Sequence, residues 1–173
     1  MFTRSRLPSP LGDLIAITAA DGTIHALDFA DFDARLRRLF ARHHPGGAVQ
    51  DGTAPPALAA AIDAYFAGHL AGLDALPVAA IGSDFQRKVW AALRTIPAGQ
   101  TRSYGQLAAA IGQPAAARAV GLANGANPIG IVVPCHRVIG TSGALTGYAG
   151  GVERKAWLLA HEGAIRPENA LQF

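Results

Sequence analysis

Residues 103–125 read SYGQLAAAIGQPAAARAVGLANG, and their pattern is the clearest indication of the fold of the second half of the chain. Ser103 and Gln106 match a capping box, in which the hydroxyl and the amide satisfy free backbone groups at a helix start. Gly112 ends that helix, and Pro114, a favoured first-turn residue, opens a second one. Two short helices around a glycine-containing turn predict either a helix-turn-helix or an ordinary helical hairpin, and spacing alone favours the hairpin.

The second of these helices consists mainly of small residues. Between positions 115 and 123 the chain has five alanines and one glycine, and Arg118 is the one large polar residue. Such a helix fills little core, but it permits close approach to another surface. A single arginine on it can reach a phosphate or enter a base stack, which favours a nucleic-acid-binding helix.

The first half has the pattern of an α/β domain. Residues 14–18 and 23–29 are β-like runs joined through Asp21 and Gly22, a strong signal for a hairpin of two antiparallel strands. Further predicted segments are a helix over 32–43, a helix over 58–70, a linker over 71–83, and a helix that a second capping box opens at Ser83 and Gln86.

Composition restricts the class of protein. Half of the 173 residues are apolar, but no run approaches the roughly 20 residues of a membrane span. The N-terminus leads into Pro8 and Pro10 rather than an apolar signal segment. A single cysteine excludes an internal disulfide and a thiolate zinc cluster, so we expect a globular protein of a reducing compartment, the cytoplasm or a eukaryotic nucleus.

Charge is divided unevenly along the chain. Residues 1–83 have six Arg against eight Asp, a net charge of −2, whereas residues 84–173 have nine Lys and Arg against four Asp and Glu, a net charge of +5. A polyanion-binding module attached to an acidic one shows this asymmetry, and so does a solvated surface without a partner. Nucleic acid is therefore one of two open interpretations.

The only cysteine, Cys135, lies in the run IVVPCHRVI at positions 131–139. His136 and Arg137 follow it, so a nucleophile, a base and a positive charge are adjacent in sequence. A nucleophilic cysteine needs such a neighbour to hold the thiolate, but consecutive residues of a strand point to opposite faces. Spacing alone therefore favours a buried structural cysteine, unless Pro134 and the nearby glycines bend the chain.

Several motifs together resemble the O6-alkylguanine-DNA alkyltransferase family. The residues concerned cover most of positions 84–163: SYGQLA at 103–108, AARAVG at 116–121, NP at 127–128, PCHRV at 134–138, and WLLAHEG at 157–163. Residues 1–83 agree with the family only in general pattern. The resemblance implies a DNA repair protein that irreversibly transfers a methyl or other alkyl group from O6 of guanine in duplex DNA to its own cysteine, with O4 of thymine left open as a second position.

The resemblance also implies a role for five residues at the reacting centre. Cys135 matches the alkyl acceptor, and His136 matches the histidine that activates it through a water. Glu162 matches the glutamate that orients this histidine, and Asn127 matches the asparagine that organises the turn. Tyr104 matches the tyrosine that donates to guanine N3 as the C–O bond breaks.

Two further sets of residues are implied around the damaged base and the DNA. The base pocket would be formed by Val138, Tyr148 and Ala149, where Ala149 lacks the serine hydroxyl of many relatives but keeps a backbone N–H. Arg118 matches the arginine that fills the space left by a flipped-out nucleotide. The other residues implied to lie along the DNA are Ser103, Gly105, Gln113 and Thr141. For Arg137 and Lys155 the resemblance does not decide the role, and each could be a structural residue or a solvated one.

The implied fold has two parts. Residues 1–80 would form an α/β, RNase H-like structural domain, and residues 81–173 a mainly helical, helix-turn-helix or winged-helix-like domain that binds DNA and accepts the alkyl group. The implied partner is double-stranded DNA containing O6-alkylguanine, with no cofactor, no metal and no membrane. We expect a monomer in the cytoplasm, on the nucleoid when bound to DNA, with cooperative binding left open. Two alternatives are a thiol hydrolase and a non-catalytic lesion binder.

Overall fold

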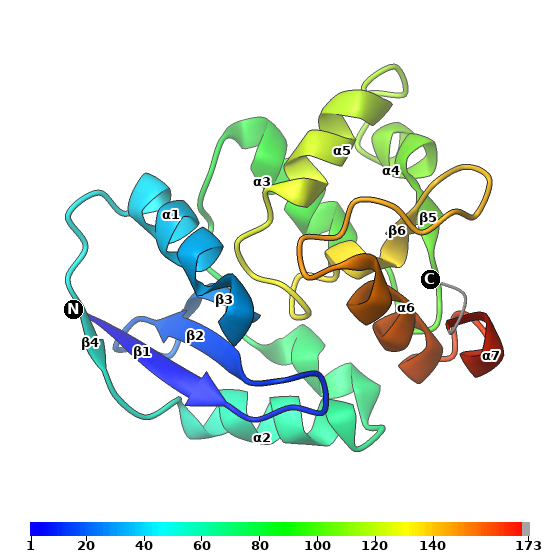
Figure 1. Cartoon of the computed structure of the whole chain (residues 1–173). Coiled ribbons are helices and arrows are strands. Elements are labelled where there is room, and N and C mark those ends of the chain that lie inside the picture. Colours follow the sequence, from blue (N-terminus) through cyan, green and yellow to red (C-terminus); the bar gives the residue numbers. More distant parts are fainter. Residues whose placement is uncertain (171–173) are drawn as a thin grey trace. The chain divides into compact units, whose positions relative to one another are not determined.

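A computed structural model describes residues 1–170 of the chain (Figure 1). It contains two compact units. Unit 1 consists of residues 1–81 and 128–132, and unit 2 of residues 82–127 together with the chain from Val133 onward. The domain boundary expected after residue 80 stays a prediction, because the chain also returns to unit 1 for the five residues before Val133.

Unit 1 is built on a four-stranded sheet with the order β3-β2-β1-β4. The strands are β1 (Phe2–Leu7), β2 (Leu14–Thr18), β3 (Ile24–Phe29) and β4 (Val49–Asp51). The predicted hairpin is confirmed, since β2 and β3 pair antiparallel. β1 was not predicted; it pairs antiparallel with β2 and parallel with β4, and the Arg4 and Arg6 side chains obscure its alternating pattern.

Helices cover both sides of this sheet (Figure 1). All five residues of β2 are buried, as expected for a central strand packed on both faces. The helix predicted over 32–43 is α1 (Asp33–His43), preceded by a 3-10 turn, η1 (Ala30–Phe32). Leu36 and Phe40 of α1 pack on Ile15 and Ile17.

The second predicted helix of unit 1 is shorter than expected. It is α2 (Pro56–Phe66), which starts two residues before the predicted 58–70 and ends four residues earlier. Gly68, with a φ of 106°, adopts a conformation that ends the helix. The chain then forms a 3-10 helix, η2 (Leu70–Ala75), all but the first residue of which falls in the predicted linker over 71–83.

Unit 2 is mainly helical. Its elements are α3 (Asp84–Leu93), β5 (Arg102–Ser103), α4 (Tyr104–Ala110), α5 (Ala117–Gly125), η3 (Cys135–Arg137), β6 (Val138–Ile139), α6 (Val152–His161) and α7 (Pro167–Ala170). Both predicted capping boxes are confirmed, at Ser83 and Ser103. The helix predicted from Pro114 begins only at Ala117, because the Ala116 N–H bonds to the Gln113 carbonyl in a turn.

Short parallel pairing of β5 with β6 brings two distant segments together in unit 2. Arg102 is opposite Val138, and Ser103 is opposite Ile139. The first residue of α4, Tyr104, therefore lies beside the segment that follows Cys135. Within residues 1–170, no helix is long and apolar enough to cross a membrane.

Candidate functional site

Cys135 lies in a tight turn rather than in an extended strand. It begins the 3-10 turn η3, and its side chain is buried within unit 2. The Val133 carbonyl accepts two hydrogen bonds, from the Cys135 N–H at 2.8 Å and from Asn127 Nδ2 at 2.8 Å. Because Cys135 and His136 lie in a 3-10 turn, the alternation of side chains between the two faces of a strand does not apply to them.

His136 and Arg137 both contact the carboxylate of Glu162. His136 Nε2 lies 2.8 Å from Glu162 Oε2, while Arg137 donates from Nε to Oε1 at 2.8 Å and from its terminal nitrogen to Oε2 at 2.9 Å. A further Arg137 N–H donates to the Ile96 carbonyl at 2.7 Å. All three side chains are almost fully buried. Of the two positions left open for Arg137, structural or solvated, its burial excludes the solvated one.

The charges in this cluster fix its protonation. Burial on its own would raise the pKa of Glu162, but the His136 and Arg137 contacts outweigh it and hold that pKa well below its usual value of 4.5. Burial lowers the pKa of His136 below 6.5, despite the opposing effect of the Glu162 carboxylate. At neutral pH the cluster therefore consists of an anionic Glu162, a cationic Arg137 and a neutral His136.

Lys155 places a second buried positive group at the site. Its Nζ donates to the Val138 carbonyl at 2.5 Å and to the Thr146 carbonyl at 2.8 Å, and the residue is 0% exposed. Burial lowers its pKa to about 8, while its interaction with Cys135 acts in the opposite direction. The ammonium is thus available to stabilise a thiolate on Cys135. Of the two positions that the resemblance left open for Lys155, structural or solvated, its burial excludes the solvated one.

The Lys155 ammonium and the Glu162 carboxylate lie on the same face of α6. Lys155, Leu158, Leu159 and Glu162 follow the spacing i, i+3, i+4, i+7 and are all buried. Glu162 is the residue that caps the C-terminus of α6, and its N–H bonds to the Leu158 carbonyl at 3.0 Å. The apolar members of the face anchor α6, so the carboxylate and the ammonium are held rigidly.

Tyr104 and the predicted base-pocket residues differ in their burial. The Tyr104 hydroxyl donates to the Thr146 carbonyl at a long 3.4 Å, and its ring lies over Gly121, where a Cβ would come within 3.7 Å. Val138 is fully buried, whereas Tyr148 and Ala149 are half-buried. The Tyr148 ring meets the His136 ring edge-on, with 6.4 Å between centroids.

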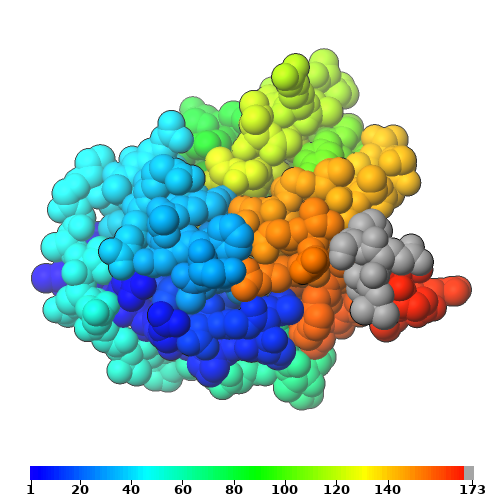
Figure 2. Space-filling view, viewed as in Figure 1, coloured from blue at the N-terminus to red at the C-terminus, as the bar shows by residue number. Residues whose placement is uncertain are grey.

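The residues implied to contact DNA are among the more accessible ones of unit 2. Arg118, Gln113 and Thr141 are exposed, while Ser103 and Gly105 are half-buried at the start of α4. Arg118 shares the exposed face of α5 with Ala119 and with Leu122, which is 73% exposed. Figure 2 shows the yellow-green α5 segment at the molecular surface. A nearly bare helix face with one arginine is thus available to a partner.

Asn124 is a site residue that the sequence argument missed. It lies in the last turn of α5, is 3% exposed, and donates from Nδ2 to the Cys135 carbonyl at 3.2 Å. Asn127 follows the end of α5 in a turn, where its N–H bonds to the Asn124 carbonyl at 3.3 Å, so the two asparagines are close together. A buried amide in a helix of small apolar residues needs a polar partner.

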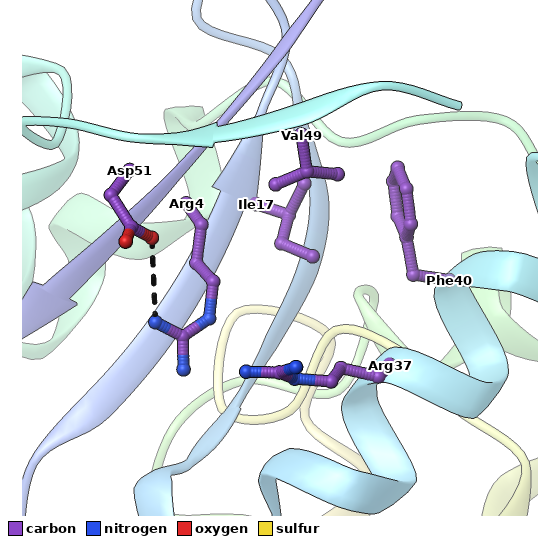
Figure 3. A pocket seen from close by; sticks show the side chains of 6 residues that line it. All are labelled: Arg4, Ile17, Arg37, Phe40, Val49 and Asp51. Carbon is purple, nitrogen blue, oxygen red and sulfur yellow. Dashed lines mark ion pairs between the residues drawn. The ribbon is translucent and has the colours of Figure 1, made fainter. Parts of the chain in front are cut away.

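A cavity of about 300 Å³ lies in unit 1 and is chemically different (Figure 3). Its lining residues are Arg4, Ile17, Arg37, Phe40, Val49 and Asp51. Arg4 and Arg37 both bind Asp33, at 2.9 and 2.7 Å, and Arg4 also pairs with Asp51 at 3.6 Å. The lining contains no nucleophile, and its charges are compensated, so the candidate site is the Cys135 cluster. In residues 1–170 no three His, Cys, Asp or Glu side chains are grouped to hold a metal ion.

Family comparisons match almost the whole chain. Residues 4–80 match the 6-O-methylguanine DNA methyltransferase ribonuclease-like domain, and residues 84–164 match the DNA-binding domain of the same family. A methylated-DNA–protein-cysteine methyltransferase of Salmonella typhimurium is 52% identical over 162 residues, which are 92% of this chain and 95% of the relative. A protein of the same name from Mycobacterium tuberculosis is 57% identical over 122 residues, which are 69% of this chain and 73% of the relative.

Solved structures agree with these matches. The crystal structure of Mycobacterium tuberculosis OGT in complex with DNA has a TM-score of 0.80 and 39% identity, covering 99% of each chain. The O6-methylguanine-DNA methyltransferase of Pyrococcus kodakaraensis has a TM-score of 0.64 and 25% identity, covering 94% of this chain and 99% of that one. The similarity thus extends over both units, including residues 1–83, where sequence motifs gave only a general pattern.

Proposed function

Because the chain belongs to the 6-O-methylguanine DNA methyltransferase family, we propose that Cys135 accepts the alkyl group that the protein removes from O6 of guanine in duplex DNA. The observation that carries this proposal is the buried Cys135–His136–Glu162 cluster, in a chain with a single cysteine. The relatives are named for transfer to a protein cysteine. Cys135 is the one residue here that can fill that role.

His136 acts as the base for the Cys135 thiol. The anionic Glu162 accepts the N–H of His136 Nε2, so the neutral ring keeps its lone pair on Nδ1. Nδ1 is buried and has no hydrogen-bond partner among the described residues. It is thus available to take the thiol proton, and a water between the two groups is the relay that the family resemblance implies.

The transfer step is a substitution at the alkyl carbon. Sulfur forms a bond to this carbon as its bond to O6 breaks, and the electron pair of the broken bond stays on the purine oxygen. The thiol proton finally neutralises the purine, and the Tyr104 hydroxyl donates to N3 while charge develops. The hydrogen bond of the Tyr104 hydroxyl to the Thr146 carbonyl is long and therefore weak, so the hydroxyl can exchange it for one to N3 at little cost. A thioether has no ready leaving path, so each chain acts once.

The residues proposed to face DNA lie at the end of β5, on α4 and α5, in the turn between these two helices, and in the loop after β6. A base in a duplex cannot present O6 to a buried sulfur, so the nucleotide must be turned out of the stack, and Arg118 then occupies its space. The small residues of α5 suit entry into the narrow minor groove. Ser103, Gly105, Gln113 and Thr141 contact the flanking backbone, in a domain of helix-turn-helix or winged-helix-like type.

Three broader expectations remain part of the proposal. The base pocket formed by Val138, Tyr148 and Ala149 accepts O6-alkylguanine first, with O4-alkylthymine as a second substrate to be tested. The protein acts as a monomer, with cooperative binding along DNA as a separate measurement. Its site of action is the cytoplasm and, when bound to DNA, the nucleoid.

Stoichiometry separates this function from the two alternatives. With O6-methylguanine duplex in large excess, the amount of restored guanine should reach a plateau at one per chain. A thiol hydrolase would continue to turn over, and a lesion binder would restore none. Continued turnover or a complete lack of repair by folded, reduced protein would therefore contradict the transferase proposal.

A further inference from the structure

Asn124 and Asn127 hold the peptide units on both sides of the nucleophile. Asn127 Nδ2 binds the Val133 carbonyl at 2.8 Å, and Asn124 Nδ2 binds the Cys135 carbonyl at 3.2 Å. We call this arrangement the asparagine clamp. Both carbonyls also accept a backbone N–H, from Cys135 and Val138 respectively, so each has two donors. The clamp therefore fixes the turn that presents the Cys135 sulfur.

We propose that Asn124 is a positioning residue for the transfer step, which connects the DNA-facing helix α5 to the orientation of Cys135. This inference rests on the proposed function. Arg118 lies near the start of α5 and Asn124 in its last turn, so one short helix bears both residues. The position that α5 adopts on DNA is therefore passed on to the Cys135 carbonyl through its hydrogen bond with Asn124.

The unpaired half of the Asn124 amide supports a role beyond packing. Its Oδ1 is buried and has no hydrogen-bond partner among the described residues. A leucine has nearly the same shape and would leave no buried acceptor unpaired, whereas an unpaired acceptor carries a desolvation penalty. Only the Nδ2 donation to Cys135 offsets that penalty. The donor, rather than the volume of the side chain, is thus what asparagine contributes here.

Positioning matters only when the electrophile is itself held in place. For DNA-bound O6-methylguanine the sulfur must meet a fixed carbon, and a displacement of about 1 Å can cost about a hundredfold in rate. A small reagent such as iodoacetamide approaches from any allowed direction, so its reaction depends on exposure and thiolate content. The two reactions therefore distinguish positioning from stability.

The test compares Asn124→Leu with Val120→Ala, a substitution of a buried apolar residue of the same helix, whose side chain has no hydrogen-bond donor for the Cys135 carbonyl. Three quantities are measured for each variant and for wild type: the single-turnover transfer rate at saturating O6-methylguanine duplex, the affinity for that duplex, and the rate of Cys135 labelling by iodoacetamide without DNA. For Asn124→Leu we expect transfer to fall about tenfold to a hundredfold, while affinity and labelling stay within about threefold. Val120→Ala should keep the wild-type transfer rate.

Several results would overturn the proposal. One is transfer by Asn124→Leu at the wild-type rate. A second is a fall in DNA affinity with no fall in the transfer rate at saturating duplex. The third is a rate of iodoacetamide labelling that rises as the transfer rate falls, because the site has opened. If Asn124→Leu does not fold, Asn124→Asp keeps the shape and replaces the donor by an acceptor; wild-type transfer by that variant contradicts the role equally. Absence of any transfer by wild type would instead refute the proposed function.

Discussion

The Glu162 carboxylate is the group on which both the stability and the chemistry of the site depend, and Glu162→Gln tests it. Glutamine keeps the shape but presents one oxygen and one NH₂ to three donors, two from Arg137 and one from His136. A glutamine oxygen at the Oε2 position keeps the contacts from His136 Nε2 and the terminal nitrogen of Arg137, but its NH₂ group then faces the Arg137 Nε–H, so one charge-assisted hydrogen bond of about 1.5–3 kcal/mol is lost and the buried Arg137 loses its counter-charge. We therefore expect the free energy of unfolding at pH 7 to fall by about 3–5 kcal/mol, as for other broken buried pairs.

The same substitution should weaken the base. The Glu162 anion is the group that raises the His136 pKa against the effect of burial, so without this charge the imidazole is a poorer acceptor for the thiol proton. General-base catalysis contributes about a hundredfold to ten-thousandfold, and transfer from O6-methylguanine duplex should fall by up to that range. Single-turnover transfer of a labelled methyl group measures the rate, and urea unfolding measures the stability.

The pH dependence of that stability has a defined sign. The folded pKa of Glu162 is depressed below the ordinary value of 4.5, so its contribution is complete above that pH and decreases as pH falls towards the folded pKa. The difference in unfolding free energy between wild type and Glu162→Gln should therefore narrow below about pH 4.5. Glu153→Gln, at an exposed position of the same helix, is the matched control. Transfer by Glu162→Gln within about twofold of wild type would refute the assignment of the base.

Two further predictions concern the positive groups. Lys155→Met should reduce thiolate formation on Cys135 at pH 7, by about tenfold if about 1.4 kcal/mol of stabilisation is lost. Because the Lys155 pKa is about 8, the ratio of wild-type to variant labelling by iodoacetamide should decline as pH rises through 8; a ratio independent of pH contradicts this role. Arg118→Ala should slow repair in duplex DNA at least about tenfold but leave reaction with free O6-methylguanine base nearly unchanged, and equal losses on both substrates would exclude the stack-filling role.

Local signals in the sequence predicted much of the fold. The capping boxes at Ser83 and Ser103 and the hairpin of residues 14–29 depend on neighbours in sequence, and all three are present. β1 could not be predicted in this way, because its Arg4 is paired with Asp33, 29 positions away. The charged side chains of β1 therefore disguise its strand pattern in the sequence, and only their contacts with distant residues account for them.

Prediction of the candidate site from the sequence was also limited by contacts between distant residues. Spacing alone favoured a structural Cys135, because the 3-10 turn that redirects it depends on amides 8 and 11 positions earlier, Asn127 and Asn124. The burial of Arg137 and Lys155 also follows from contacts with Glu162, Val138 and Thr146 rather than from any periodic pattern. The family resemblance supplied the roles, whereas the distances supply the reason why a neutral histidine can act as base.

Alkyl transfer to Cys135 is tested most directly by mass spectrometry of the intact protein after exposure to excess O6-methylguanine duplex. We predict that wild type gains the mass of one methyl group in place of one hydrogen, that the gain maps to the peptide containing Cys135, and that it never exceeds one per chain. Cys135→Ser, folded and able to bind the same duplex, should gain nothing. An unmodified Cys135 in folded, reduced wild type, or a methyl group carried by Cys135→Ser, would contradict the account.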